Sequence, residues 1–224
     1  MSGITLWLVL AGVPLVLGLW AQRRVSSTFK RYSQVPTASG MSGEDAAAAV
    51  LRASGLQGVG IEHIRGRLSD HYDPRSRTLR LSADVGQART VAALGVAAHE
   101  AGHALQHAQG YKLMKIRQTL VPAAQFGQSL WFLPVVIGLL VGATGLVQLG
   151  VALFAAVVLF QLVTLPVEFD ASKRALVALS DGRMLTADEL TGARSVLNAA
   201  ALTYVAGFVA ALGQLVYFFL LSRD

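Results

Sequence analysis

The chain of 224 residues contains no cysteine and little charge. Without a thiol it can form no disulfide, no zinc–thiolate site and no cysteine nucleophile. Charged residues make up 14% of the chain, whereas soluble domains average roughly 25%. This shortage is local, because long parts of the chain hold no ionisable residue and the rest of the chain carries every charge.

Three long stretches lack Asp, Glu, Lys, Arg and His, and they are residues 1–22, 118–167 and 195–222. A membrane-spanning helix needs about 20 apolar residues. The first and third stretches therefore fit one span each, and the second fits two. A purely soluble protein is thereby excluded. The spans are predicted at about 4–20, 130–147, 149–166 and 198–221, and the 50-residue stretch is expected to turn between Gly142 and Gly150.

The first span resembles a signal peptide, but no Lys or Arg precedes it and Arg23 and Arg24 follow it directly. We therefore expect an uncleaved anchor. Of the 19 Lys and Arg residues, 14 lie in 23–117 and four more in 173–194. With four spans, both of these basic segments lie on the same side of the membrane. The positive-inside rule assigns this side to the cytoplasm, so both termini are expected outside. Basic residues beside spans favour anionic lipid over nucleic acid as the partner.

The charged segments predict helices and a small β structure. Ser42 and Asp45 can cap a helix over 41–55, and strands at 59–64 and 78–82 flank a turn at Asp73 and Pro74. A helix rich in Ala and Gly is predicted over 85–109, and its small side chains favour burial among other helices. The stretch 111–128 fits either a helix on the membrane surface or a solvated connecting helix.

The expected organisation has five parts. They are an N-terminal anchor (1–22), a cytoplasmic segment with the small-residue helix (23–128), a membrane hairpin (129–167), a cytoplasmic helix (168–196) and a fourth transmembrane helix (197–224).

The small-residue helix contains His99, Glu100 and His103 in the pattern His-Glu-x-x-His. Histidines at i and i+4 share a helix face and can bind one zinc ion, while the glutamate between them can act as a general base on water. A catalytic zinc site takes three protein ligands. His107 continues the same face, but i to i+8 spans about 12 Å, so we expect His107 to pack rather than to bind the metal.

Two carboxylates after the third span compete for the third position. Glu168 shares its helix face with small residues, which suits burial against the histidine helix, whereas Asp170 faces Lys173 and Arg174 as in a surface ion pair. We therefore predict Glu168 as the ligand, with Asp170 either facing solvent or hydrogen-bonded to a ligand.

Four segments together resemble the YugP-type neutral zinc metallopeptidases, a family of bacterial membrane proteases. They are Ala97–Gln106, Leu68–Pro74, Val167–Ser172 and Val196–Val205. The resemblance runs nearly end to end. It implies one zinc ion per chain held by His99, His103 and Glu168, with Glu100 as the catalytic residue. Gluzincins carry Asp four residues after the ligand Glu to orient a histidine; here that position is Ser172, whose hydroxyl can still accept an imidazole N–H.

The expected protein is a mainly α integral membrane protein with four transmembrane helices, a zincin-like helical metalloprotease site and a short β-hairpin. It is expected to lie in the bacterial inner membrane and to hydrolyse peptide bonds of membrane or membrane-proximal proteins at the cytoplasmic face. The strand 78–82 fits two alternatives, an edge for pairing with a peptide substrate or part of a plain structural hairpin.

Several side chains are candidates for lesser roles. His71 is the first candidate for a donor to the substrate oxyanion, ahead of Tyr72, Arg77 and Tyr204. Asn198 can hydrogen-bond a site residue or join helices. The alternative function is a non-catalytic membrane scaffold with a structural zinc ion. The sequence names neither the substrate nor the oligomeric state.

Overall fold

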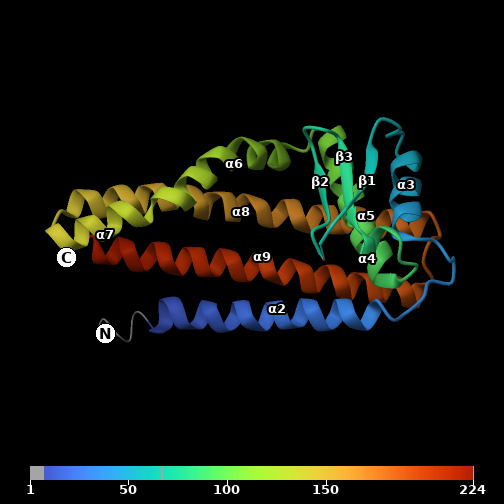
Figure 1. The fold of residues 1–224 in the computed structure, drawn as a ribbon, viewed down its shortest axis with the longest axis horizontal. Coiled ribbons are helices and arrows are strands. Elements are labelled where there is room, and N and C mark those ends of the chain that lie inside the picture. The colour runs from blue at the N-terminus through green and yellow to red at the C-terminus, as the bar shows by residue number, and fades with distance from the viewer. Residues whose placement is uncertain (1–7, 67, 224) are drawn as a thin grey trace. The chain divides into compact units, whose positions relative to one another are not determined.

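The computed structural model describes residues 8–66 and 68–223, and most of them are helical (Figure 1). The helices are η1 (Leu8–Gly12), α2 (Val13–Tyr32), α3 (Gly43–Ala53), α4 (Ala83–Gly86), α5 (Val91–Ala108), α6 (Lys112–Leu130), α7 (Phe132–Val141), α8 (Thr144–Asp181) and α9 (Ala187–Leu221). The strands are β1 (Gly60–Ile64), β2 (His71–Asp73) and β3 (Thr78–Ser82). The predicted mainly α class is confirmed.

Four helical stretches are long and apolar enough to cross a membrane, as predicted, and they are Leu8–Tyr32, Lys112–Val141, Thr144–Asp181 and Ala187–Leu221. Their bounds differ from the predicted ones. The membrane hairpin turns at Gly142, whose φ of 70° suits glycine, rather than further on toward Gly150. Residues 4–7 of the first predicted span lie outside the described residues. All four stretches also include charged residues outside the predicted spans, since they reach Tyr32, begin at Lys112, end at Asp181 and begin at Ala187.

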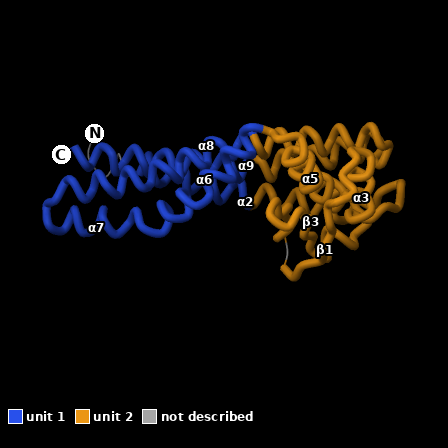
Figure 2. Tube along the Cα trace, turned by 90° about the horizontal axis from the view of Figure 1, so that it is seen from above, with its two compact units in different colours: residues 1–22, 112–166, 202–224 blue, residues 23–111, 167–201 orange. Residues whose placement is uncertain are grey.

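The chain divides into two compact units (Figure 2). Unit 1 comprises residues 1–22, 112–166 and 202–224, and unit 2 comprises residues 23–111 and 167–201. Inside unit 1, Trp131 packs on Phe154 and Phe218, with ring centroids 4.9 and 5.3 Å apart. Glycines let its helices approach closely, since a Cβ on Gly127 would meet the carbonyl oxygen of Leu153.

Unit 2 contains a three-stranded sheet in the order β1-β3-β2. β1 pairs with β3 in parallel and β2 pairs with β3 antiparallel. The predicted short hairpin is present as β2 and β3. The expectation that 78–82 is an edge strand is wrong, since β3 is the central strand and β2 is an edge. The reason is a crossover that the sequence pattern does not reveal, because β1 and β3 pair across residues 65–77.

The start of unit 2 follows the local signals. Ser42 and Asp45 form the predicted capping box at α3, in which each side chain binds the other's backbone N–H. The single helix predicted over 85–109 is instead broken into α4 and α5. Between them the backbone of Arg89 and Thr90 pairs with residues 36 and 37, and the Thr90 hydroxyl caps α5.

The small residues of α5 allow very close packing, as predicted. A Cβ on Gly102 would lie 2.5 Å from the backbone oxygen of Ala171 in α8, and a Cβ on Gly95 would lie 3.4 Å from Cβ of Ala193 in α9. Since a side chain at Gly102 would clash with backbone, α5 and α8 touch at this level. This close approach places His103 on α5 beside Glu168 on α8.

Candidate active site

Three potential ligand atoms converge where α5 meets α8. His99 Nε2 lies 3.2 Å and His103 Nε2 lies 3.5 Å from the same oxygen of Glu168, Oε2. All three ligand atoms lie within 4.8 Å of one another. Tetrahedral zinc with bonds of about 2.0–2.1 Å separates its ligand atoms by about 3.4 Å. The spacing and the chemistry of these donors therefore fit one zinc ion.

The outward nitrogens of both imidazoles also have partners. His99 Nδ1 lies 3.1 Å from Ser172 Oγ, and His103 Nδ1 lies 3.0 Å from Gln106 Oε1. Such contacts orient an imidazole ring and leave its Nε2 free to bind a metal. Ser172 thus contacts a histidine at the position where the gluzincin pattern has Asp, with a hydroxyl in place of a carboxylate.

Glu100 follows His99 and is 8% exposed. Its Oε2 accepts a hydrogen bond of 3.0 Å from the backbone N–H of Tyr72 in β2. Burial raises the pKa of Glu100 to about 7, and Glu168 and Asp70 nearby add to the rise while His99 opposes it. A carboxyl group with a pKa near neutrality can accept and return a proton at neutral pH.

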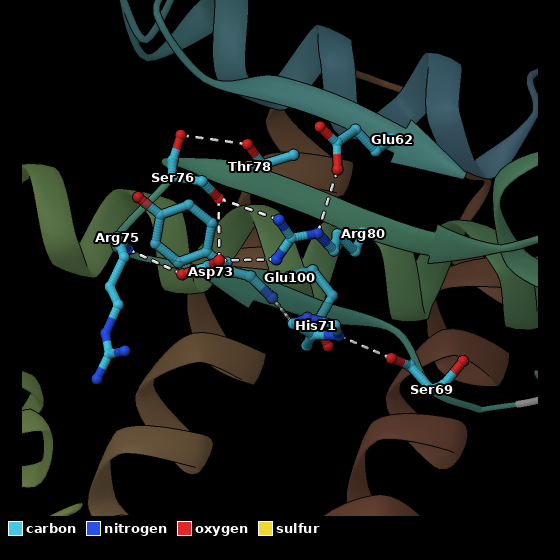
Figure 3. Close-up of polar contacts among 10 residues, drawn as sticks. Glu62, Ser69, His71, Asp73, Arg75, Ser76, Thr78, Arg80 and Glu100 are labelled. Atoms are coloured by element: carbon cyan, nitrogen blue, oxygen red, sulfur yellow. Dashed lines mark hydrogen bonds and ion pairs between the residues drawn. The ribbon is translucent and has the colours of Figure 1, made fainter. Parts of the chain in front are cut away.

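Strand β2 is held in the sheet by a charged network that Figure 3 shows. Arg80 on the central strand donates to Asp73 on β2 at 2.7 Å and to Glu62 on β1 at 3.2 Å. The hydrogen bonds from Arg80 and from the Arg75 backbone keep the pKa of Asp73 below its ordinary value. The network thereby places the Tyr72 N–H against Glu100.

The other predicted residues are scattered around this centre. Asp170 lies beside the site, where it accepts from Gln106 at 2.7 Å and from Arg174 at 2.5 Å. His71 is exposed on β2, and its Nδ1 lies 2.8 Å from the carbonyl oxygen of Ser69. Asn198 is exposed and lines a cavity of about 530 Å³ that also includes Ser172.

Three further candidates are His107, Tyr204 and Arg77. His107 Nδ1 lies 2.8 Å from the Tyr72 hydroxyl, so it packs beside the site, as expected, and is not part of the three-residue cluster. Tyr204 belongs to unit 1. Arg77 is exposed and has a positive φ of 53° next to β3.

Comparison with known proteins decides the family. The model of a family described as "Putative neutral zinc metallopeptidase" matches residues 7–223. The chain belongs to this family. A relative from Bacillus subtilis (strain 168), named "Putative membrane protease YugP", is 42% identical over 222 residues, which cover 98% of this chain and 99% of the relative. No solved structure matches the chain.

Family membership agrees with the resemblance inferred from the sequence, and the four apolar helices agree with a membrane protein. Sequence reasoning passed over Gln106, which the structure buries fully between α5 and α8. Its spacing was a usable signal, because a residue three positions after His103 lies on the same side of the helix. A buried glutamine beside a histidine must find hydrogen-bond partners.

Proposed function

We propose that this chain is a membrane-bound zinc endopeptidase in which His99, His103 and Glu168 hold one zinc ion and Glu100 is the general base. The observation that carries the proposal is the convergence of both Nε2 atoms on Glu168, with Glu100 buried beside them. A structural zinc site has no need of a buried carboxylate next to its ligands, so Glu100 favours catalysis over the scaffold alternative.

Each residue has a separate task in peptide hydrolysis. When bound, zinc would polarise the scissile carbonyl group and make water at the site more acidic. Glu100 takes a proton from the attacking water at its carboxylate oxygen and passes it to the nitrogen of the departing amine. Ser172 and Gln106 orient the two imidazoles.

Substrate binding is proposed along β2, the edge strand beside Glu100. An extended peptide can pair with the backbone of an edge strand, which gives affinity without demanding a particular sequence. His71 is exposed on this strand, and it is proposed as the donor that stabilises the oxyanion of the scissile carbonyl. The substrates would be membrane or membrane-proximal proteins.

The site is proposed to face the cytoplasm from the bacterial inner membrane. Unit 2 contains 15 of the 19 Lys and Arg residues of the chain, and basic segments favour the cytoplasmic side. Fusing a reporter that is active on one side only to residue 224 tests this arrangement, because the proposed topology places the C-terminus outside.

Substitution of Glu100 by Gln tests the catalytic role. The variant keeps the shape of the side chain but cannot accept a proton, so we expect one zinc ion per chain and a loss of casein cleavage of about 10²–10⁴-fold. Zinc is counted by elemental mass spectrometry of the purified protein in detergent, and cleavage is followed with fluorescently labelled casein.

The matched control is Glu44→Gln, which alters a half-buried carboxylate that is paired with His63 and is not one of the three clustered ligands. It is expected to cleave casein at the wild-type rate. Casein cleavage by Glu100→Gln at the wild-type rate would refute the catalytic role. A wild-type chain that holds zinc and cuts no casein would favour the scaffold alternative, and one that takes up no supplied zinc would refute both.

A further inference from the structure

Gln106 has a role that neither the motif nor the family description assigns. Its side chain is fully buried. It makes one hydrogen bond within α5 and two to α8, the two helices that carry the proposed ligands. Oε1 lies 3.0 Å from His103 Nδ1, while Nε2 lies 2.8 Å from the carbonyl oxygen of Val167 and 2.7 Å from Asp170 Oδ2. Val167 and Glu168 are adjacent in α8.

These partners decide which way the amide points. The Val167 carbonyl can only accept hydrogen bonds, and the same holds for an ionised Asp170 carboxylate. The NH₂ group of Gln106 must therefore face these two oxygens, and its Oε1 must face His103. An amide oxygen only accepts, so His103 Nδ1 carries a proton, and Nε2, which faces Glu168 and the ligand cluster, is the nitrogen that can bind a metal.

The amide is in turn held by charge. Asp170 Oδ2 accepts both from Gln106 and from Arg174 Nε, and Arg174 also contacts Gln109 and lies over the ring of Tyr111. The chain of contacts from Arg174 through Asp170 and Gln106 to His103 thus ends on a proposed ligand. His99 has a weaker arrangement, since the Ser172 hydroxyl beside it can donate as well as accept.

We propose that Gln106 is a positioning residue for zinc: it fixes His103 as the Nδ1–H tautomer and ties this imidazole to the backbone next to Glu168. The inference rests on the proposed zinc site. Loss of such a contact to a metal-binding imidazole typically costs 10–100-fold in metal affinity. We expect the same loss here, because the partners of Gln106 allow its amide only one orientation.

The test is a chelator titration of the zinc-loaded protein in detergent. Gln106→Met removes all three hydrogen bonds at similar volume, and we expect zinc affinity to fall about 10–100-fold. Gln106→Glu keeps an oxygen toward His103 but gives up the amide donors to Val167 and Asp170. It is expected to lose folding stability and yet to hold zinc at least about tenfold more tightly than Gln106→Met.

Gln109→Met is the matched control, since it is the same substitution three residues further along the chain. The native Gln109 side chain contacts Arg174 rather than His103. It should leave zinc affinity within about twofold of the wild type, well short of the 10–100-fold expected from losing an imidazole contact. If Gln106→Met fails to fold, Gln106→Glu tests the proposal alone. The expected result is then a zinc affinity within about tenfold of the wild type.

Two results would overturn the role of Gln106 while leaving the zinc site intact. The first is wild-type zinc affinity in folded Gln106→Met. The second is a Gln106→Glu variant that loses zinc as readily as Gln106→Met, which would mean that the oxygen facing His103 does not contribute to zinc binding. A wild-type chain that takes up no zinc would instead refute the proposed function itself.

Discussion

The two units of the chain stabilise their interiors by different means. Unit 2 buries ionisable and amide side chains, and Glu100, His103, Gln106 and Glu168 all have hydrogen-bond or ion-pair partners there. The described part of unit 1 buries mostly apolar side chains and leaves large apolar ones exposed, among them Leu140 at 81%. Exposed apolar side chains on membrane-spanning helices suit lipid, whereas unit 2 depends on partners for its polar groups.

Helix α8 allows this difference to be tested within one element, because it contributes to both units. Leu159 in unit 1 and Val177 in unit 2 are exposed to a similar degree, 47% and 51%. Asp in the middle of a membrane helix costs about 2.5–3.5 kcal/mol, while a polar substitution on a water-exposed surface usually stays within about 0.5 kcal/mol.

We therefore expect Leu159→Asp to reduce the amount of protein recovered from membranes and its unfolding temperature in detergent, and Val177→Asp to change neither. Membrane fractionation with quantitative immunoblotting measures the first property, and a thermal scan measures the second. Equal effects of the two substitutions would mean that α8 has the same surroundings along its whole length.

Close helix contacts sharpen the comparison, since both units have such contacts at glycines. Gly102→Ala would push a Cβ against the backbone of Ala171, and Gly127→Ala would push one against the backbone of Leu153. Overpacking of this kind costs about 1–3 kcal/mol, so both variants should unfold at lower temperature. An added Cβ at Gly102 would move apart the two helices that carry the proposed ligands, so Gly102→Ala alone should also weaken zinc binding.

The chelator titration distinguishes the two variants, with the thermal scan as the measure of general damage. Gly127→Ala is the control for destabilisation without a change at the cluster. Zinc loss in both variants to the same extent would indicate that zinc affinity simply follows overall stability.

The smallest effect is expected at the sheet of unit 2. Arg80→Ala removes the ion pairs to Asp73 and Glu62, which are partly exposed and therefore contribute little. The pKa of Asp73 is lower in the folded chain than in the unfolded chain. The ionised Asp73 therefore stabilises the fold fully at pH values above its unfolded pKa of about 4. This contribution is lost as the pH falls toward the pKa of the folded state. The gap in unfolding temperature between wild type and Arg80→Ala should thus shrink from pH 7 to pH 3.

Arg75→Ala is the matched control, because the Arg75 contact to Asp73 comes from its backbone N–H and survives the substitution. Figure 3 shows the Arg75 side chain directed away from Arg80. An Arg80→Ala gap that stays constant with pH would show that Asp73 draws no stability from Arg80.

Features that depend on neighbours along the chain could be predicted from the sequence. The cap at Ser42 and Asp45 needs only a spacing of three, and the shared face of His99 and His103 needs only a spacing of four. Glu168 was preferred over Asp170 because small residues accompany it on its helix face, and the structure brings Glu168 against both histidines.

Features that depend on distant partners could not be predicted in this way. The central position of β3 arises from pairing with β1 across residues 65–77, and the break before α5 arises from backbone bonds to residues 36 and 37. The role of Gln106 depends on Val167 and Asp170, about sixty residues further along the chain. Periodicity within one segment contains no information on such contacts.

The convergent ligand atoms are two imidazole nitrogens and one carboxylate oxygen, with no sulfur among them. Oxidants and thiol-modifying reagents destroy zinc sites built from thiolates, because the sulfur itself reacts. A site built from His99, His103 and Glu168 has no such weakness, and no cysteine elsewhere in the chain can form a disulfide. A zinc ion held there should therefore stay bound under oxidative stress that disables thiolate-bound zinc proteins.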